Sequence, residues 1–164
     1  MAENQSGTKA KALNYVPRGI RNNNPLNIRK NGIKWSGQVK HKDAFCVFLE
    51  PKWGWRAALI IICRSYRKRG LTTVWKIIHS WAPPEENETE YYSKFVAFRS
   101  DVGLDTPLPS IYKNPDLYFK LLKNMAIMEN GEKYVTTEVL DPLKGAIKAY
   151  LEEFPESNKV TSNK

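Results

Sequence analysis

The chain has 164 residues, 41% of them hydrophobic and 12% aromatic, which is typical of one globular domain with an ordinary core. Its formal net charge of +9 favours a polyanionic partner such as nucleic acid, an anionic membrane surface or an acidic polymer. The longest apolar run, AALIIIC, is too short to span a bilayer, and the first residues lack the apolar segment of a secretory signal.

The positive charge lies mainly in the first half of the chain. Residues 1–45 carry a net charge of +7, residues 46–100 a net charge of +4, and residues 101–164 a net charge of −2. Cys46 and Cys63 match no metal-binding or redox spacing, so we expect two small buried thiols, with a disulfide as the alternative. The sequence contains no phosphate-binding glycine loop, no dinucleotide fingerprint and only two histidines, so we expect no metal and no cofactor.

The chain begins with a polar segment and then predicts a small sheet. We expect flexible tails at residues 1–14 and 156–164, and a single domain at residues 15–155. Asn31-Gly32 fits the two positive-φ positions of a type I′ turn, which predicts a β-hairpin within RGIRNNNPLNIRKNGIKWSG. The apolar run from Ala44 to Leu49 predicts a third strand.

Five helices are predicted after the sheet, because the apolar residues recur at intervals of three and four. The predicted starts include Thr72 or Thr73 as an N-cap, Asn87 as an N-cap, and Asn114-Pro115. The first, fourth and fifth helices are predicted at about 52–69, 115–128 and 138–154. The second carries its apolar residues from Val74 to Trp81, and the third from Tyr91 to Val96. The fold class is therefore α+β, mainly α, with a small antiparallel sheet lobe followed by a helical lobe and a cleft between them.

Two carboxylates are candidates for catalysis. Glu86 follows Pro83 and Pro84 in WAPPEENET, where a rigid apolar wall would raise its pKa and let it act as a general acid. Asp43 is the only acidic residue between positions 4 and 49, and it would face the cleft from the sheet side. Each also has a structural interpretation, since acids near a helix start are common and Asp43 could pair with a neighbouring lysine.

The asparagine-rich segment has two interpretations. Asn side chains favour tight turns and left-handed backbone, which needs no function. Their amides also donate and accept hydrogen bonds, as sugar hydroxyl and acetamido groups require, and an indole ring can stack on a sugar. The residues predicted to contact sugar in this segment are Asn23, Asn24, Asn27 and Trp35.

Three blocks of the sequence resemble a family of small phage-encoded proteins described as virion structural or endolysin-like, with a lysozyme-like relationship. The blocks read RGIRNNNPLNIR…W.G, D.F.VF..P..G.RA and GL.TV..II..WAPPEENET..Y, and they run from about Pro17 to Gly103. This chain has Leu26 where the family pattern has Gly. Residues from Leu104 onward match nothing in the pattern.

The resemblance implies a lysozyme-like fold that degrades or binds cell-wall glycan. It places Glu86 and Asp43 on the shared pattern as catalytic candidates, and it adds as substrate-binding candidates Trp81, Asn87, Thr89 and Tyr91. Lysozymes usually carry their catalytic Glu at the end of a helix that precedes the sheet, but the only Glu before the sheet here is Glu3. The acid must therefore come from elsewhere, or the scaffold binds glycan without cutting it.

Three functions follow from these observations. The first is a peptidoglycan-degrading muramidase or lytic transglycosylase, made in the cytoplasm and acting at the cell wall after release or as part of a virion. The second is a non-catalytic virion structural or glycan-binding protein on the same scaffold. The third is a basic nucleic-acid-binding module, supported by the net charge and by the basic run RSYRKRG.

Overall fold

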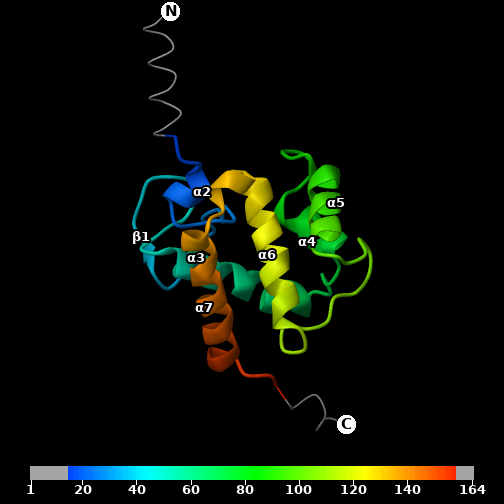
Figure 1. Cartoon of the computed structure of the whole chain (residues 1–164). Helices are drawn as coiled ribbons and strands as arrows, with labels where there is room; N and C mark the ends of the chain where they lie inside the picture. The colour runs from blue at the N-terminus through cyan, green and yellow to red at the C-terminus, as the bar shows by residue number, and fades with distance from the viewer. Residues whose placement is uncertain (1–14, 158–164) are drawn as a thin grey trace, which may run out of the picture.

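The computed structural model describes residues 15–157, so the segments 1–14 and 158–164, where tails were predicted, lie outside the described residues. The fold is mainly helical with one small antiparallel sheet, which confirms the α+β, mainly α class (Figure 1). The elements are α2 (Arg18–Arg21), β1 (Gln38–Val39), β2 (Val47–Phe48), α3 (Pro51–Ile60), η1 (Ile61–Tyr66), α4 (Val74–Trp81), α5 (Thr89–Arg99), α6 (Pro115–Asn130), η2 (Glu132–Tyr134) and α7 (Thr137–Glu153).

The sheet differs from the predicted hairpin. β1 pairs with β2, and an isolated bridge joins Arg29 to Phe45, so Asn31-Gly32 does not connect two paired strands. A type I′ turn needs positive φ at both central residues, but Asn31 is not among the described non-glycine residues with positive φ. Its side-chain oxygen instead accepts a hydrogen bond from the Ile33 backbone N–H at 3.2 Å, which forms a local turn. The hairpin prediction was wrong, and only the core of the predicted third strand is a strand.

The helices begin close to where the sequence places them. Thr73 caps α4 by accepting a hydrogen bond from the Lys76 backbone N–H at 3.2 Å. Asn114 caps α6 in the same way, and Pro115 occupies the first turn, where its missing N–H has no cost. These two N-cap predictions are confirmed.

The third predicted helix begins two residues later than its predicted cap. Glu88 occupies the N-cap position of α5, and it makes no side-chain capping bond. Asn87 instead donates its side-chain amide to the Pro83 carbonyl at 3.0 Å, which closes the proline turn before the helix. The prediction that Asn87 is the N-cap was therefore wrong, and the cause is this competing bond within the turn.

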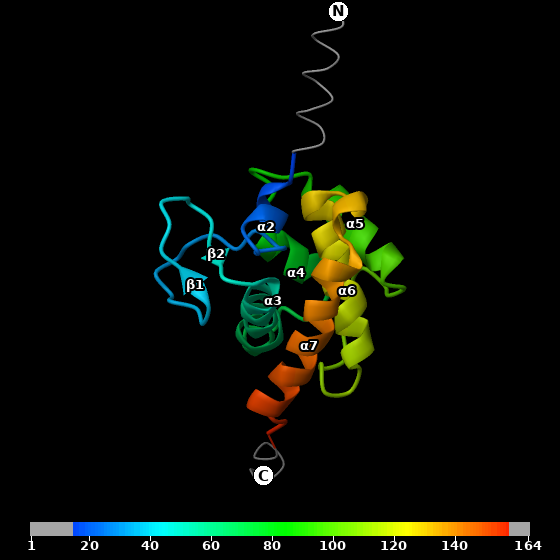
Figure 2. The ribbon, with the colours of Figure 1, turned by 60° about the vertical axis from the view of Figure 1, so that its left-hand side comes forward.

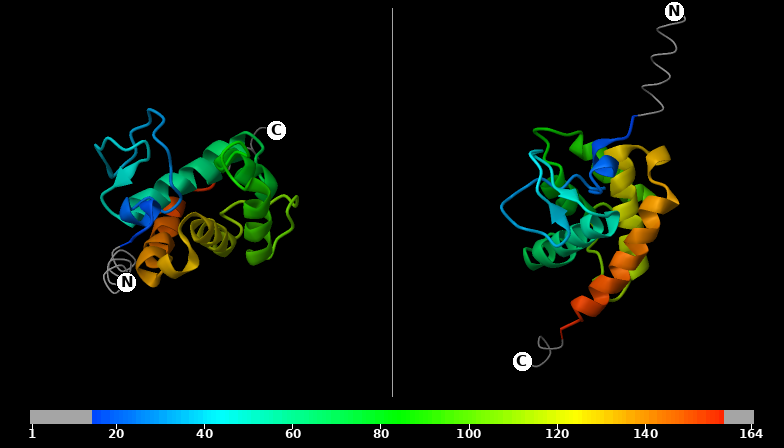
Figure 3. Two further views of the ribbon diagram at one scale, coloured as in Figure 1. Left: turned by 90° about the horizontal axis from the view of Figure 1, so that it is seen from above. Right: turned by 90° about the vertical axis from the view of Figure 1, so that its left-hand side faces the viewer.

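The helices pack around a core shared by α3, α6 and α7, while the sheet lobe lies to one side of them (Figures 1 and 2). α3 and η1 form one continuous rod that begins beside the sheet lobe and ends near α4 (Figure 3). Trp55 is fully buried on this rod, and its indole N–H donates to the Val139 carbonyl of α7 at 2.8 Å. The rod thus fixes the sheet lobe against the helical body.

Among residues 15–157 no helix combines the length and the apolar composition that crossing a bilayer requires.

Candidate functional site

A half-buried carboxylate, Glu129, lies next to the C-terminal end of α6. It continues an inward-facing row that includes Leu122 and Met125, at helical intervals of three and four. Its Oε1 accepts a hydrogen bond from the Asn27 side-chain amide at 2.8 Å, and its Oε2 accepts one from the Tyr92 hydroxyl at 2.8 Å. α6, α5 and the asparagine-rich loop therefore meet at this one acidic group.

The environment of Glu129 favours the protonated acid. Burial raises the pKa of its carboxyl group, and the hydrogen bonds from Asn27 and Tyr92 lower it by less. Among the described residues, no lysine or arginine forms an ion pair with Glu129, whereas five other acidic side chains have such partners. A carboxyl group held only by neutral donors can keep its proton at a higher pH than one beside a cation.

The two donors to Glu129 are held in place by the fold. Asn27 has a left-handed backbone with φ of 54°, which Asn tolerates better than most residues. Tyr92 is buried on the inner side of α5, and burial together with the Glu129 carboxylate raises its pKa well above the usual value. Tyr92 therefore stays a neutral hydrogen-bond donor at any physiological pH.

Glu129 lines a small cavity of about 170 Å³, here called the inner pocket. Glu86 lines the same pocket, but 66% of its side chain is exposed and it forms an ion pair with Arg29 at 3.3 Å. The other lining residues include Asn27, Phe45, Trp81, Pro83 and Asn87. Two carboxylates thus line one pocket. Glu129 is half-buried and accepts hydrogen bonds from Asn27 and Tyr92, whereas Glu86 is largely exposed to solvent.

A larger open groove of about 480 Å³ adjoins the inner pocket, because Asn27, Arg29 and Trp81 line both. We call it the outer groove. Trp35 of the sheet lobe borders it, and the π-helical turns of η1 bring Tyr66 to its other side. The indole N–H of Trp81 donates to the Leu26 carbonyl at 3.0 Å, which holds that ring between the two cavities. The two cavities therefore form adjoining, aromatic-lined spaces, and Glu129 lines the smaller one.

Some of the residues predicted to contact sugar are used by the fold instead. Asn23 has φ of 54° and donates to the carbonyls of Phe48 and Leu49 at 3.0 and 3.2 Å. Asn24 is fully buried, and its amide bonds to Ile28 and Cys46. Both asparagines fasten the loop to β2, and neither lines the inner pocket or the outer groove.

Two predicted residues on α5 also lie outside the groove. Thr89 is buried at the start of the helix, where its hydroxyl donates to the Ala82 carbonyl. Tyr91 is 62% exposed and packs against Phe95 on the outer side of the helix. Of the candidate residues between positions 81 and 91, the structure brings Trp81, Glu86 and Asn87 to the inner pocket but not these two.

Asp43 lies beside the inner pocket without lining it. Its Oδ1 accepts a hydrogen bond from the Phe45 backbone N–H at 3.2 Å, and this bond is the main reason that its pKa is lowered. The positive charge of Arg18 lowers the pKa further. The Phe45 ring, stacked between Arg18 and Arg29, lines the pocket in its place.

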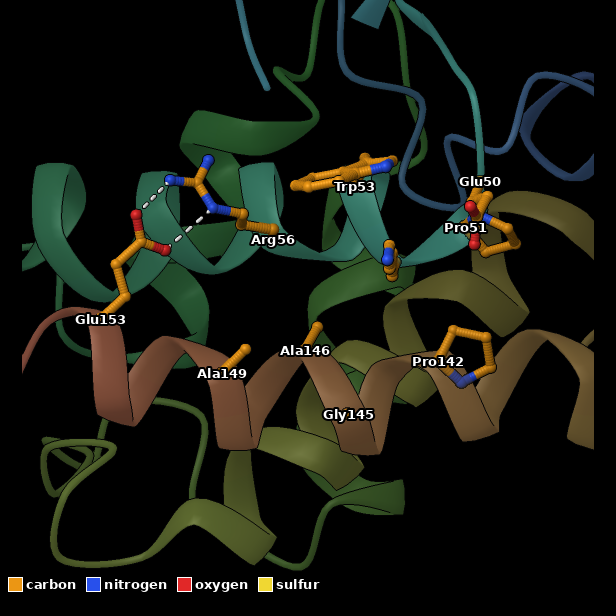
Figure 4. Close-up of a pocket in the computed structure, with 10 residues that line it drawn as sticks. Glu50, Pro51, Trp53, Arg56, Pro142, Gly145, Ala146, Ala149 and Glu153 are labelled. Carbon is orange, nitrogen blue, oxygen red and sulfur yellow. Dashed lines mark hydrogen bonds and ion pairs between the residues drawn. The ribbon is translucent and has the colours of Figure 1, made fainter. Parts of the chain in front are cut away.

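A separate pocket of about 510 Å³ lies between α3 and α7, on a different set of residues (Figure 4). Trp53 covers it, and Pro142, Gly145, Ala146 and Ala149 form its other wall. Its strongest charges, Arg56 and Glu153, already pair with each other through two bonds of 3.1 and 2.7 Å. The other acid of this pocket, Glu50, is exposed, whereas Glu129 is half-buried and holds two side-chain hydrogen bonds, so the inner pocket is the better candidate for chemistry.

Sequence reasoning missed Glu129, Tyr92 and Phe45 as members of the site. The predicted fourth helix ended at about Met128, one residue before Glu129, whereas α6 continues to Asn130 and places Glu129 in line with Leu122 and Met125. Its partner Asn27 lies 102 residues away in the sequence, so the pairing itself needed the fold.

Comparison with known proteins identifies a relative in a bacterial virus. The chain is 36% identical to "Protein P5" of Pseudoalteromonas phage PM2 over 129 residues, which cover 76% of this chain and 78% of the relative. The chain belongs to the family of this phage protein. The membership agrees with the expected phage origin, and the relative's name states no activity or ligand.

No model of a protein family matches the chain. The phage relationship therefore rests on the similarity to protein P5.

Proposed function

We propose that this phage protein cleaves a glycosidic bond of peptidoglycan, with Glu129 as the general acid. The observation that carries the proposal is a half-buried carboxyl group with a raised pKa, bonded only to neutral donors, in a pocket that continues an aromatic-lined groove. Glycosidic cleavage needs a protonated carboxyl group beside the leaving oxygen. A groove lined by indole rings and side-chain amides suits a glycan.

Glu129 suits the role of the acid better than Glu86 does. The Glu86 side chain is largely in solvent and lies 3.3 Å from the guanidinium of Arg29, so nothing around it favours the neutral form. In the proposed mechanism Glu86 is instead the second carboxylate of the inner pocket, and it orients water or stabilises positive charge at the anomeric carbon. Asp43, bonded to the Phe45 backbone, orders the loop that carries the Phe45 ring.

Glu129 offers an acid for the lysozyme-like mechanism, for which the sequence has no suitable glutamate before the sheet. In lysozymes the catalytic Glu ends a helix that precedes the sheet, whereas α6 follows the sheet in this chain. The end of α6 nevertheless packs beside α2, which leads into the sheet lobe, and Asn130 donates to the Pro25 carbonyl at 2.8 Å. We infer a lysozyme-like arrangement with a permuted order of elements, in which the acid still lies between the helical body and the sheet lobe.

The test is the digestion of purified peptidoglycan by wild type, Glu129→Gln and Glu86→Gln. Removing a general acid typically lowers the rate by about 10²–10⁴-fold, so we expect Glu129→Gln to be nearly inactive. Glu132→Gln is the matched control, because this nearby acid pairs with Arg99 at 3.0 Å and lines neither cavity. Reducing product ends would indicate a hydrolase, and anhydro ends would indicate a lytic transglycosylase. Full activity of Glu129→Gln would refute the assignment.

The second candidate function is a non-catalytic role as a wall-binding or virion protein. The membership of this chain in a phage protein family favours this role. It predicts that wild type binds insoluble peptidoglycan but releases no soluble fragment. Measuring pelleted protein and released sugar in the same sample separates the two functions.

A further inference from the structure

The sheet lobe carries a concentration of positive charge that the proposed cleavage does not use. No acidic residue occurs from position 4 to position 42, and the lobe contains Arg29 and four lysines before Asp43. The lobe lies apart from α5 and α6, on the opposite side of α3 (Figure 2). Like charges gathered on a projecting lobe create a field that attracts polyanions.

Four basic side chains of the lobe line one hollow of about 440 Å³, here called the cationic hollow. They are Lys30, Lys34, Lys40 and His41, with Trp35 among them. No carboxylate lines the hollow, and within residues 15–157 none of its lysines forms an ion pair. The hollow therefore has an uncompensated positive charge inside a concave surface.

Hydrogen bonds hold the walls of this hollow. Lys30 donates to the His41 carbonyl, and the Gln38 side-chain oxygen accepts from the Trp35 backbone N–H at 3.0 Å. His41 Nδ1 accepts from the Asp43 backbone N–H at 3.1 Å, which leaves Nε2 to donate to a ligand. The indole N–H of Trp35 is buried and has no hydrogen-bond partner among the described residues. Both the histidine and the indole thus have a donor to spare.

We propose that the cationic hollow binds a phosphorylated sugar unit of an anionic polysaccharide. Lysine ammonium groups are compact point charges that suit phosphate oxygens, and an indole ring suits the apolar face of a sugar. The volume of the hollow is in the range of small-ligand sites, which fits one sugar phosphate unit rather than a folded partner. Through Trp35 the hollow adjoins the outer groove, so one glycan strand can occupy both.

The lining favours a sugar phosphate over nucleic acid. Proteins that bind single-stranded nucleic acid stack successive bases on several aromatic side chains, but Trp35 is the sole aromatic residue among those lining the hollow. No arginine lines it either, although arginine is the residue that most often reads base edges. Nucleic acid is therefore the competing ligand that the experiment must exclude.

The experiment measures binding of the full chain to three polymers of equal length: a sugar phosphate polymer, neutral dextran and single-stranded DNA. We expect tight binding only to the sugar phosphate polymer, weakened about tenfold or more between 50 and 200 mM salt. Lys34→Gln/Lys40→Gln is expected to weaken binding about tenfold or more, since each lysine near an anionic surface contributes measurably. A chemical shift change of the Trp35 indole N–H with glucose 6-phosphate, but not with glucose, locates the site.

The matched control is Lys120→Gln/Lys148→Gln, which removes the same charge from exposed positions on α6 and α7. We expect this control to bind the sugar phosphate polymer nearly as well as wild type. An equal loss in both double variants would show that net charge alone drives binding, and it would overturn the proposal. Tighter binding to DNA, or no binding to the sugar phosphate polymer, would also overturn it. None of these readouts depends on glycan cleavage.

Discussion

The side-chain amide of Asn27 donates to the Glu129 carboxylate at 2.8 Å, and this bond joins the asparagine-rich loop to the last turn of α6. Asn27 lines the inner pocket and the outer groove, so the same residue contacts the acid and borders the path of a substrate. The bond stabilises the ionised form of Glu129, whereas burial stabilises the neutral form, and burial has the larger effect. The pKa of Glu129 is therefore adjustable through its partners.

Removing the Asn27 amide should raise the pKa of Glu129 further. Asn27→Gly is the appropriate change, because glycine adopts the φ of 54° at little cost. A general acid works only while protonated, so the high-pH limb of the rate profile should move to higher pH. We also expect the maximal rate to fall about tenfold, since one hydrogen bond to a charged group contributes about 1.5–3 kcal/mol. Titration of the Glu129 carboxyl by NMR checks the direction without requiring activity, and an unchanged or lower pKa would contradict it.

Glu129→Gln should make the protein more stable at neutral pH relative to wild type. A carboxyl group whose pKa is raised in the folded state binds its proton more tightly when folded. The wild-type free energy of unfolding therefore falls as the pH rises from the ordinary value of 4.5 through the folded-state pKa. Glutamine has no such proton to lose. Its Oε1 can still accept from Asn27, and its Nε2 can donate to the hydroxyl oxygen of Tyr92.

Urea unfolding of both proteins at pH 4 and pH 7.5 measures this effect. We expect the advantage of Glu129→Gln over wild type to be larger at pH 7.5 than at pH 4. The same comparison with Glu132→Gln should show no such gain, because that substitution removes an exposed ion pair with Arg99. A constant difference at both pH values would show that the folded state does not shift the Glu129 pKa.

The sequence predicted the helices well and the sheet poorly, for physical reasons. Helix ends depend on local chemistry, so Thr73 and Asn114 could be identified as caps from their neighbours alone. The Asn31-Gly32 turn failed because hairpin formation depends on what the flanking strands pair with, and Arg29 pairs with Phe45 instead. The short helix α2 was missed, since four residues carry too little periodicity.

Only part of the candidate site was predicted from the sequence. Trp81, Glu86 and Asn87 belong to one sequence block, so their shared position in the inner pocket follows from local spacing. Glu129 comes from a segment that matched no pattern, and its role depends on burial under a loop that is distant in sequence. Asn23, Asn24 and Asn27 cannot be told apart in the sequence. Their hydrogen bonds show that Asn23 and Asn24 hold the fold together, whereas Asn27 contacts the acid of the site.

Two glycines in helices should respond oppositely to alanine. A Cβ on Gly54 of α3 would lie 2.3 Å from the Asn23 carbonyl oxygen, so Gly54→Ala should destabilise the protein by about 1–3 kcal/mol. A Cβ on Gly145 of α7 would meet nothing within 4 Å, so Gly145→Ala should stabilise it by about 0.5–1 kcal/mol. Thermal unfolding of the two variants is the measurement, and the same sign for both would contradict this packing.

Both cysteines should be unreactive in the folded protein. Cys46 is fully buried, Cys63 is partly buried, and both are free. Burial raises the pKa of both thiols, that of Cys63 to about 12. The thiolate is the reactive form, so alkylation at pH 8 should be at least about a hundredfold slower than in urea. Rapid labelling of the folded chain would show that these thiols are accessible.

The ion pair between Arg56 and Glu153 should stabilise the contact of α3 with α7 in a pH-dependent way. Its two bonds measure 3.1 and 2.7 Å, and the hydrogen bond from Arg56 lowers the pKa of Glu153. A lowered folded-state pKa gives stability that is present above the ordinary value of 4.5 and is lost as the pH falls through the folded-state pKa. Because the Glu153 side chain is 46% exposed, we expect a coupling of only about 0.5–1 kcal/mol at pH 7. A double-mutant cycle with Arg56→Gln and Glu153→Gln, measured at pH 7 and pH 3, should show this coupling at the first pH and lose it at the second. A coupling that persists at pH 3 would mean that packing of the Arg56 stem against α7, rather than charge, joins the two helices.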